Sequence, residues 1–470
     1  MGWDWFGSAD YGPARFVVVH LLALTYLMGF LTAVHQFRPL LGERGLTPVP
    51  PFLRATGFRR APSLFQLHYS DRFFAVVAWT GVVISAAALA GATDLLPLWA
   101  YVLVWSALWV LYLSIVNIGQ VWYAFGWESL LLEAGFLAIF LGPAWLAVPM
   151  PVLWLLCWLL FRVEFGAGLI KMRGDACWRD FTALYYHHET QPMPGPLSPL
   201  FHHLPRPLHR VEVAANHFTQ LVVPFGLFAP QPVATAAGLL VVVTQLWLVL
   251  SGNFAWLNLV TITLAFAAVR VPGPTLATTP SPPWHVAAVL GLVVLVAVLS
   301  YWPVRNMLGR KQVMNRSFNK FHLGNTYGAF GSITRTRYEV VFEGDDGTGW
   351  HEYDFKGKPG DVMRRPPQIA PYHLRLDWLM WFCAISPGYG RTWLPRFLAG
   401  LLRNDAQVLE LLRRNPFPDR PPVQVRARMF RYRFTTRAQR RETGAWWVRS
   451  PAGDLIPPVS LADLGAAQDP

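Results

Sequence analysis

Charged residues are scarce in this chain. They make up 14% of the 470 residues, whereas soluble domains usually carry about 25%. Hydrophobic residues make up 53%. This combination excludes an ordinary soluble protein and predicts a polytopic α-helical membrane protein.

Cysteine is scarce too, with only Cys157, Cys177 and Cys383. Their spacing matches no metal site, and an odd number cannot all pair within one chain, so a disulfide framework is excluded. The first 15 residues contain acids and aromatics in place of a basic segment, and no small-residue cleavage site follows the first apolar stretch. We therefore expect no removable signal peptide and predict that this stretch stays as a membrane helix.

Long apolar stretches recur along the first 300 residues. A helix needs about 20 mostly apolar residues to cross a hydrocarbon core of about 30 Å. Four candidates are weak, since one contains Glu133, one begins with Glu212 and two are almost contiguous, so the count ranges from five to about nine. The nine candidates are residues 15–37, 73–91, 98–118, 129–147, 151–170, 211–229, 233–251, 253–270 and 284–303.

Two long loops interrupt this bundle, which we assign to residues 1–304. The loop 38–72 holds six arginines and the loop 171–210 holds five Lys or Arg, while the connections between other candidates hold none. With nine spans both loops lie on the same side as the C-terminal tail. The positive bias of short loops then predicts that this side is cytoplasmic.

The tail, residues 305–470, has a different pattern and is predicted to be a soluble β-rich α+β domain. It holds 26 of the 40 Lys and Arg and 15 of the 27 acids. We expect two strands in RYEVVFEGDDGTGWHEYDFKGKPGD and two more in PVQVRARMFRYRFTT and GAWWVRSP. Helices are expected in PYHLRLDWLMWFCAI and in FLAGLLRNDAQVLELLRRNPF, the second ending at the proline after Asn415. No nucleic-acid module is present, so the arginines indicate a solvated sheet face and no nucleic-acid partner.

Three ionisable residues lie in the apolar segment CWLLFRVEFGAGLIKMRGD, namely Arg162, Glu164 and Lys171. Charges inside a membrane are costly and usually face the bundle interior with a partner. Glu164 and Lys171 are seven residues apart and share a helix face, so a partly desolvated Lys171 that acts as a base is one interpretation. The pattern favours the other, in which Lys171 reaches the membrane surface and Arg162 pairs with Glu164.

The segment directly after that helix, CWRDFTALYYHHETQPMPGPLSPLFHHLP (residues 177–205), combines prolines with two histidine pairs, His187–His188 and His202–His203. Zinc needs three or four ligands, and adjacent histidines diverge, so each pair supplies at most one. His188 and His203 are therefore the alternative metal ligands, but the favoured expectation is that no metal or other cofactor binds.

The favoured interpretation of residues 177–205 is an ordered cap that joins the bundle to the tail. Trp178, Arg179 and Asp180 would anchor its start, since Trp is favoured at a membrane exit, and the His and Pro residues would fill its length. Its acids, Asp175, Asp180 and Glu189, are expected to pair with the Arg-rich strands after residue 420.

The strings WRDFTALYYHHETQPMPGPLSPLFHHLP, NTYGAFGSITRTRYEVVFEG, NPFPDRPPVQVRARMFRYRFTT and GAWWVRS resemble the lipase maturation factor family. The resemblance implies a polytopic protein without enzymatic turnover that helps secreted lipases reach their active fold. It implies the endoplasmic reticulum membrane in a eukaryote, whereas a bacterial relative would lie in the plasma membrane. Residues 171–210 would then correspond to the family's lipase-binding loop.

That resemblance implies a lumenal C-terminal domain, in conflict with the charge bias of the loops. The shortage of cysteine also fits poorly with direct thiol exchange by this chain. We therefore expect any redox role of this chain to be indirect.

A shorter string, FRVEFGAGLIKMRGDACWRD, is similar to a span of vitamin K-dependent γ-glutamyl carboxylases and their bacterial relatives. That resemblance implies that Lys171, on one helix face with Glu164, acts as a base. A membrane carboxylase is therefore the alternative function. A transporter is not favoured, because no matched pair of broken helices is visible.

Overall fold

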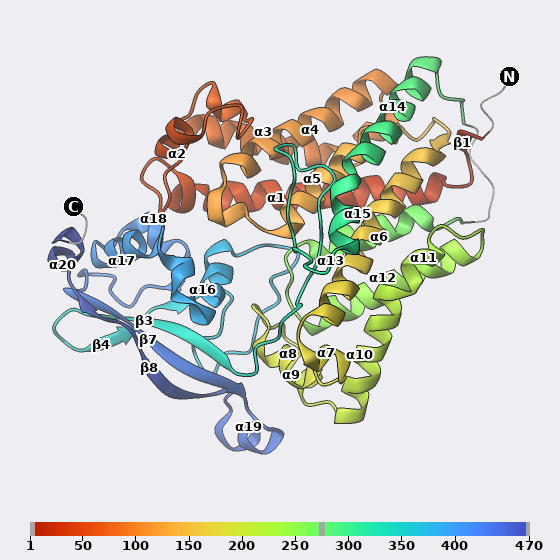
Figure 1. The fold of residues 1–470 in the computed structure, drawn as a ribbon. Helices are drawn as coiled ribbons and strands as arrows, with labels where there is room; N and C mark the ends of the chain where they lie inside the picture. The colour runs from red at the N-terminus through yellow and green to blue at the C-terminus, as the bar shows by residue number, and fades with distance from the viewer. Residues whose placement is uncertain (1–4, 272–277, 467–470) are drawn as a thin grey trace.

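The computed structural model describes residues 5–271 and 278–466. A helical bundle forms one half of the molecule, and a smaller region containing a twisted sheet packs against one end of it (Figure 1). The first described strand, β1 (Gly7–Ser8), and the last described helix, α20 (Leu461–Ala466), lie on opposite sides of the molecule.

Six helices in the described residues are long and apolar enough to cross a membrane. They coincide with six of the predicted spans. Many of their outward side chains are apolar and exposed, such as Val83, Leu103, Val243 and Val294, as expected for surfaces that face lipid. The six are α1 (Gly12–Leu41), α3 (Asp71–Leu89), α4 (Leu98–Ile118), α6 (Met150–Arg173), α12 (Val233–Ser251) and α14 (Pro283–Leu299), which continues into α15 (Tyr301–Leu308).

The other three predicted spans form shorter helices, so length and composition do not confirm a count of nine. The segment 129–147 overlaps α5 (Gly126–Ala138), which is buried on nearly all sides. The segment 211–229 overlaps α10 (Arg206–Leu221) and includes α11 (Val223–Gly226), and 253–270 contains α13 (Leu257–Ala265).

One end of the bundle, here called the N-terminal face, carries the start of the chain. Strand β1 (Gly7–Ser8) pairs with β2 (Val148–Pro149), immediately before α6. The Nε2 group of Gln231, between α11 and α12, donates to the Tyr11 hydroxyl and to the Ala268 carbonyl, each at 3.0 Å. The starts of α1, α6 and α12 and the end of α13 therefore meet at this face.

The opposite end, here called the tail face, carries both long basic loops and the C-terminal region. Trp122, after α4, donates from Nε1 to the Thr47 hydroxyl in the first loop at 2.8 Å. Gln191, in the second loop, donates to the Ser251 carbonyl at the end of α12, also at 2.8 Å. The short helices of these loops are α2 (Val49–Thr56), α7 (Ala176–Arg179), α8 (Leu184–Thr190) and α9 (Ser198–His202).

The C-terminal region contains the four predicted strands in one antiparallel sheet with the order β4-β3-β7-β8. Arginines of β7 pair across the sheet, as Arg426 does with Glu343 at 2.5 Å. A separate pair is formed by β5 (Asp354–Phe355) and β6 (Leu412–Arg414). The sheet strands are β3 (Arg337–Asp345), β4 (Trp350–Glu352), β7 (Gln424–Phe434) and β8 (Trp447–Val459).

The predicted helix over FLAGLLRNDAQVLELLRRNPF is wrong in length. It is broken after α17 because Asn404 adopts φ = +52°, a left-handed conformation that ends a helix. Asp405 then caps a new short helix by accepting from the N–H groups of Gln407 and Val408, and the chain enters β6 well before the proline. The helices of this region are α16 (Arg375–Ile385), α17 (Leu394–Leu402), α18 (Ala406–Leu409), α19 (Arg437–Thr443) and α20 (Leu461–Ala466).

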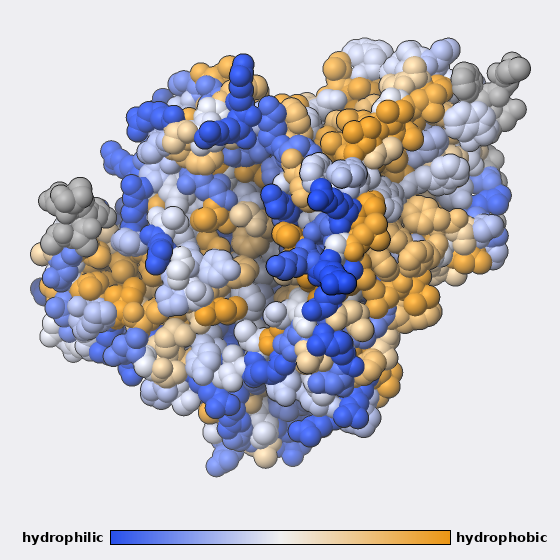
Figure 2. Space-filling model, viewed as in Figure 1, coloured by the Kyte–Doolittle hydropathy of each residue, from blue (hydrophilic) through white to orange (hydrophobic). Residues whose placement is uncertain are grey.

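Single 3-10 turns complete the fold: η1 (Leu64–Gln66), η2 (Ala92–Leu95), η3 (Gln120–Tyr123), η4 (Phe266–Ala268) and η5 (Pro387–Gly390). Figure 2 shows that apolar side chains gather over the half where α6, α11 and α14 lie. Hydrophilic side chains are more frequent over the C-terminal half and the lower edge. This division agrees with a lipid-facing bundle and a water-facing tail.

Two buried ion pairs lie where the tail meets the bundle. Arg375 of α16 donates to Glu128 of α5 at 2.8 Å, with both side chains fully buried. Glu133 of α5 pairs with Arg162 of α6 and also accepts from the Asn325 side chain and the Tyr327 hydroxyl, each at 2.8 Å. The segment after α15 therefore inserts into the bundle and satisfies a carboxylate inside it.

Candidate functional site

The second half of α6 carries the two residues of the carboxylase interpretation. Glu164 Oε1 accepts from the Gln245 side chain of α12 at 2.7 Å, and Gln245 in turn accepts from Asn258 of α13. Gly168 lies between Glu164 and Lys171, and a Cβ there would lie 2.6 Å from Leu221 of α10. The glycine therefore lets α10 approach α6 closely.

Lys171 is buried, unlike the solvent-exposed lysine expected at a membrane surface. Its Nζ donates to the side-chain oxygens of Asn216 and Gln220 of α10, each at 2.8 Å, and lies 4.7 Å from the ring centroid of Trp178. Its hydrogen-bond donors are thus directed into the protein, at the junction of α6, α10 and the cap.

The expected ion pair between Arg162 and Glu164 is wrong. Arg162 bonds to Glu133 and to the Asn325 carbonyl, the latter at 2.9 Å. Residues two apart on a helix point to different sides. Arg162 and Glu164 therefore belong to two separate buried networks.

The loop that follows α6 folds as a compact layer over the tail face. Trp178 is buried and donates from Nε1 to the Phe330 carbonyl at 2.7 Å. Asp175 pairs with Arg335 at 2.8 Å, and this guanidinium holds the pKa of Asp175 below its usual value. These contacts tie the start of the loop to the segment that leads into β3.

Arg179 and Asp180 are exposed, and among the described residues their side chains bond only to nearby parts of the chain. Arg179 donates to the carbonyls of Met172 and Gly174, and Asp180 accepts from the N–H of Thr182. The expected pairing of Asp180 with the Arg-rich strands is therefore wrong. Asp180 does not form such a pair because its side chain, like that of Arg179, is exposed on the outer surface of the loop.

Glu189 and the residues after it join the loop to the sheet. Arg337, in β3, donates to the Glu189 carbonyl at 3.0 Å and to the Pro192 carbonyl at 3.1 Å. The Glu189 carboxylate accepts from the backbone N–H of Phe434, at the end of β7, at 2.7 Å. Glu189 thus contacts a strand after residue 420, as expected, but through the backbone and not through an arginine of that strand.

The proline-rich part of the loop is fixed to α12. Ser198 donates to the Ser251 carbonyl at 2.6 Å and accepts from the N–H of Gly195 at 2.7 Å. Residues 190–195 are all buried. Prolines lack a backbone donor. In this part of the loop the Ser198 side chain makes hydrogen bonds that the prolines cannot donate.

The paired histidines separate, as expected for neighbours on a helix. His187 packs on Phe330, with ring centroids 4.7 Å apart, and burial lowers its pKa to about 3. His202 lies 3.5 Å from the Glu189 carboxylate, while burial and the neighbouring histidines lower its pKa to about 3. His203 is exposed, and its Nδ1 lies 2.6 Å from the Pro199 carbonyl.

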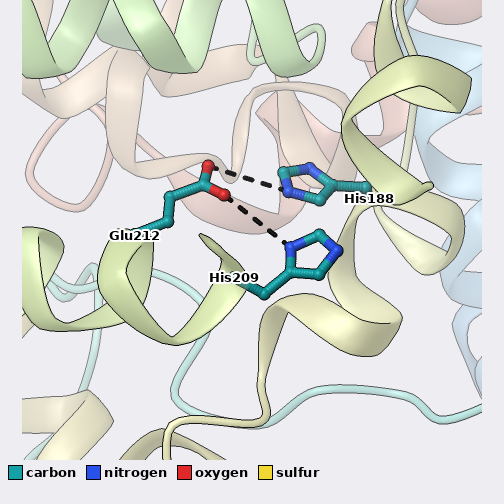
Figure 3. A group of neighbouring side chains, drawn as sticks. All are labelled: His188, His209 and Glu212. Carbon is teal, nitrogen blue, oxygen red and sulfur yellow. Dashed lines mark ion pairs between the residues drawn. The ribbon is translucent and has the colours of Figure 1, made fainter. Parts of the chain in front are cut away.

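His188 meets two residues of α10, His209 and Glu212 (Figure 3). Its Nε2 lies 3.8 Å from Glu212 Oε1, and His209 Nδ1 lies 3.8 Å from Glu212 Oε2. Both histidines are 2% exposed. The structure therefore joins His188 to His209 and not to His203, which was the expected partner in the metal alternative.

The sequence-based prediction did not include this grouping, because it considered only ligands from the two histidine pairs. His209 and Glu212 are three residues apart, a spacing that places both on one face of a helix. Since α10 begins at Arg206, the pair lies in its first two turns, next to α8. This three-residue spacing is the feature of the sequence that predicts a shared face for His209 and Glu212.

All three cysteines are buried and unbridged. Burial raises the pKa of the Cys177 thiol to about 11 and that of Cys383 to about 12. A thiol exchanges through its thiolate. At neutral pH these two side chains are therefore poor nucleophiles.

Comparison with known proteins decides between the interpretations. A family described as "Lipase maturation factor transmembrane domain" matches residues 13–271, and one described as "Lipase maturation factor C-terminal domain" matches residues 323–457. The chain belongs to the lipase maturation factor family. Both halves of the fold are represented in these matches, and nothing in them favours carboxylase chemistry.

Three curated members of the family match nearly the whole chain. Lipase maturation factor 1 from Bos taurus is 41% identical over 97% of this chain and 91% of its own length. The protein of the same name from Homo sapiens is 40% identical over 97% of this chain and 89% of its own. Lipase maturation factor 2 from Homo sapiens is 28% identical over 94% and 82%. No solved structure matches.

Proposed function

We propose that this multi-pass membrane protein assists the folding and assembly of secreted lipases or similar clients and carries out no reaction of its own. The observation that carries the proposal is the similarity to lipase maturation factors over 97% of the chain, covering bundle and tail alike. Lys171 supports it, because its contacts with α10 and Trp178 make it part of the packing between bundle and cap.

We propose further that the protein divides into a bundle domain, 1–304, and a C-terminal domain, 305–470, and that the bundle crosses the membrane nine times. The short helices α5 and α13 support this count because each runs from the tail face to the N-terminal face. Helix α5 begins beside Trp122 on the tail face, and Phe140, just after it, lies 3.1 Å from His285 at the start of α14. Helix α13 follows Ser251 and leads to Ala268 on the N-terminal face.

The polar residues of α5 do not contradict this count. Glu128 and Glu133 are 0% and 3% exposed, and their neighbours are protein side chains rather than lipid. A charged residue inside a membrane is tolerated when it faces the bundle interior with a partner. A helix surrounded by other helices need not be long or uniformly apolar.

Nine alternating crossings place both basic loops and the C-terminal domain on one side of the membrane. We propose that this side is the lumen of the endoplasmic reticulum in a eukaryote and the outer side of the plasma membrane in a bacterium, because secreted clients fold there. This assignment opposes the positive bias of the loops. It follows from the proposed clients, so sidedness tests the function directly.

Reporter cysteines can determine the sidedness of the full-length protein. The native thiols are buried, so a membrane-impermeant maleimide should react mainly with an added exposed one. We expect His203→Cys, on the tail face, to be labelled only from the lumenal or outer side. Leu95→Cys, which replaces an 84% exposed residue on the N-terminal face, should be labelled only from the cytoplasm.

Two results would contradict these proposals. Labelling of both variants from the same side would exclude an odd number of crossings between residues 95 and 203. Labelling of His203→Cys from the cytoplasm would remove the tail face from contact with secreted clients and thus exclude the proposed function.

We propose that the exposed edge of the loop 171–210 contacts the client, while its buried residues are structural. Arg179 and Asp180 are exposed there, and Phe181 and Leu200 are 37% and 52% exposed. Exposed apolar side chains beside charged ones are typical of sites for protein partners. Trp178, His187 and His188 lie beneath this edge, and His202 and His203 lie near its end.

A client assay separates the two parts of the loop. We expect Phe181→Ser combined with Leu200→Ser to lower the activity of a co-expressed secreted lipase about tenfold at unchanged abundance and melting temperature of the maturation factor. Phe58→Ser is the matched control, since Phe58 is 57% exposed on the other tail-face loop. Equal lipase activity with the double variant and the control would contradict a client site on this loop.

A further inference from the structure

His188, His209 and Glu212 lie close together, but the distances between them are too long for hydrogen bonds. Each histidine nitrogen lies 3.8 Å from a carboxylate oxygen, beyond the range of a hydrogen bond. The ligand atoms of all three residues lie within 4.8 Å of one another. Three atoms at such distances can share one ion.

The hydrogen bonds around the cluster fix which atoms carry lone pairs. His209 Nε2 lies 3.3 Å from the His202 carbonyl, and a carbonyl only accepts, so Nε2 carries the hydrogen. In a neutral ring Nδ1 is then an acceptor, and it faces the Glu212 carboxylate. Neither His209 Nδ1 nor Glu212 Oε2 has a hydrogen-bond partner among the described residues.

His188 adds to this arrangement. Both of its ring nitrogens are buried without a hydrogen-bond partner in the part of the chain that the structure describes, and the side chain is 2% exposed. Buried polar atoms are costly when unpaired. A cation between the two imidazoles and the carboxylate would satisfy His188 Nε2, His209 Nδ1 and Glu212 Oε2 together.

We propose that His188 Nε2, His209 Nδ1 and the Glu212 carboxylate bind a Zn²⁺ ion. Two imidazoles and one carboxylate form a ligand set that zinc takes in proteins. With zinc–ligand bonds of about 2.1 Å, tetrahedral ligand atoms lie about 3.4 Å apart. Each histidine nitrogen lies 3.8 Å from a carboxylate oxygen, and the three ligand atoms lie within 4.8 Å of one another, so binding the ion would draw them together by up to about 1.4 Å.

Neighbouring groups orient two of the three ligands, His209 and Glu212, in the way that is common in zinc sites. The N–H at His209 Nε2 is directed at the His202 carbonyl, and Trp247 donates from Nε1 to Glu212 Oε1 at 2.5 Å. Metal-binding histidines commonly donate their other N–H to a carbonyl, and ligating carboxylates are commonly hydrogen-bonded in turn. Since His188 lies on α8 and the other ligands on α10, the ion would fasten the cap to the bundle.

The direct test is the metal content of the full-length protein, purified in detergent without chelators. We expect about one zinc per chain in the wild type and at least a tenfold lower content in His188→Ala and in Glu212→Gln. His203→Ala is the matched control, because His203 lies in the same loop outside the cluster. It should keep its zinc.

A second measurement needs no variant and so does not depend on the folding of one. Wild-type protein stripped with a chelator should melt at a lower temperature, recover with Zn²⁺ but not Mg²⁺, and show visible absorption bands with Co²⁺. The proposal is overturned by less than about a tenth of a zinc per chain together with no response to Zn²⁺ or Co²⁺. It is also overturned if both ligand variants keep the zinc content of the wild type.

Discussion

Replacing Arg375 by Met should separate the C-terminal domain from the bundle more effectively than any surface change. The guanidinium bonds to Glu128 at 2.8 Å and to the Trp122 carbonyl, and its carbon lies 3.5 Å from the ring centroid of Tyr123. Both members of the pair are fully buried. The change therefore leaves the carboxylate of Glu128 without its cation.

Removal of one partner from a buried ion pair typically costs about 3–5 kcal/mol, a factor of about 10² to 10⁴ in the unfolding equilibrium. We expect the melting temperature in detergent, followed by tryptophan fluorescence, to fall by roughly 5–15 °C. Arg396→Met, on the exposed side of α17, is the matched control and should shift it by less than about 2 °C.

The double variant Glu128→Met with Arg375→Met tests the cause of the loss. Replacing both charges by apolar side chains is often neutral, so the double variant should recover most of the lost stability. The reasoning is refuted if Arg375→Met melts within about 2 °C of the wild type. It is also refuted if the double variant is no more stable than the single one.

Three further predictions follow from the loop and the helix before it. Lys171→Met should keep lipase maturation within about twofold of the wild type. It should cost about 1–3 kcal/mol in stability, because two buried amide oxygens lose their donor. Complete loss of function at normal abundance would favour the carboxylase alternative. Gly168→Ala should cost about 1–3 kcal/mol by pressing α10 away from α6, and an unchanged melting temperature would contradict that close contact. Asp175→Asn should cost about 1 kcal/mol at pH 7. Because Arg335 lowers the folded pKa of Asp175, this stability is present above a pH of about 4 and is lost as the pH falls further, so wild type and variant should converge in acid melting curves.

The elements that could be predicted are those whose pattern is complete within the segment itself. Helices such as α1 and α14 are long and apolar along their whole length, and the alternation in β7 matches a sheet with one buried face. The segments of α5 and α13 are short or polar when taken alone. They are stable because neighbours distant in sequence surround them, as Arg375 does for Glu128.

The contacts within the loop after α6 could be predicted only in part. The layer over the tail face lies where the histidines and prolines indicate, yet the ion pairs within it differ from those expected. Arg162 selects Glu133, which is 29 residues away, over Glu164, because helix geometry separates residues two positions apart. His188 meets His209 instead of His203 because the first turns of α10 pack against α8.

The insertion of Asn325 and Tyr327 into the bundle has a consequence for biosynthesis. The carboxylate of Glu133 receives hydrogen bonds from residues that are made more than 190 positions later in the chain. Until the ribosome has passed that point, α5 and α6 carry a buried charge pair that lacks part of its hydrogen bonding. A premature stop codon before residue 325 would thus damage the membrane-embedded half as well as the missing tail, and would mark the nascent protein for quality control.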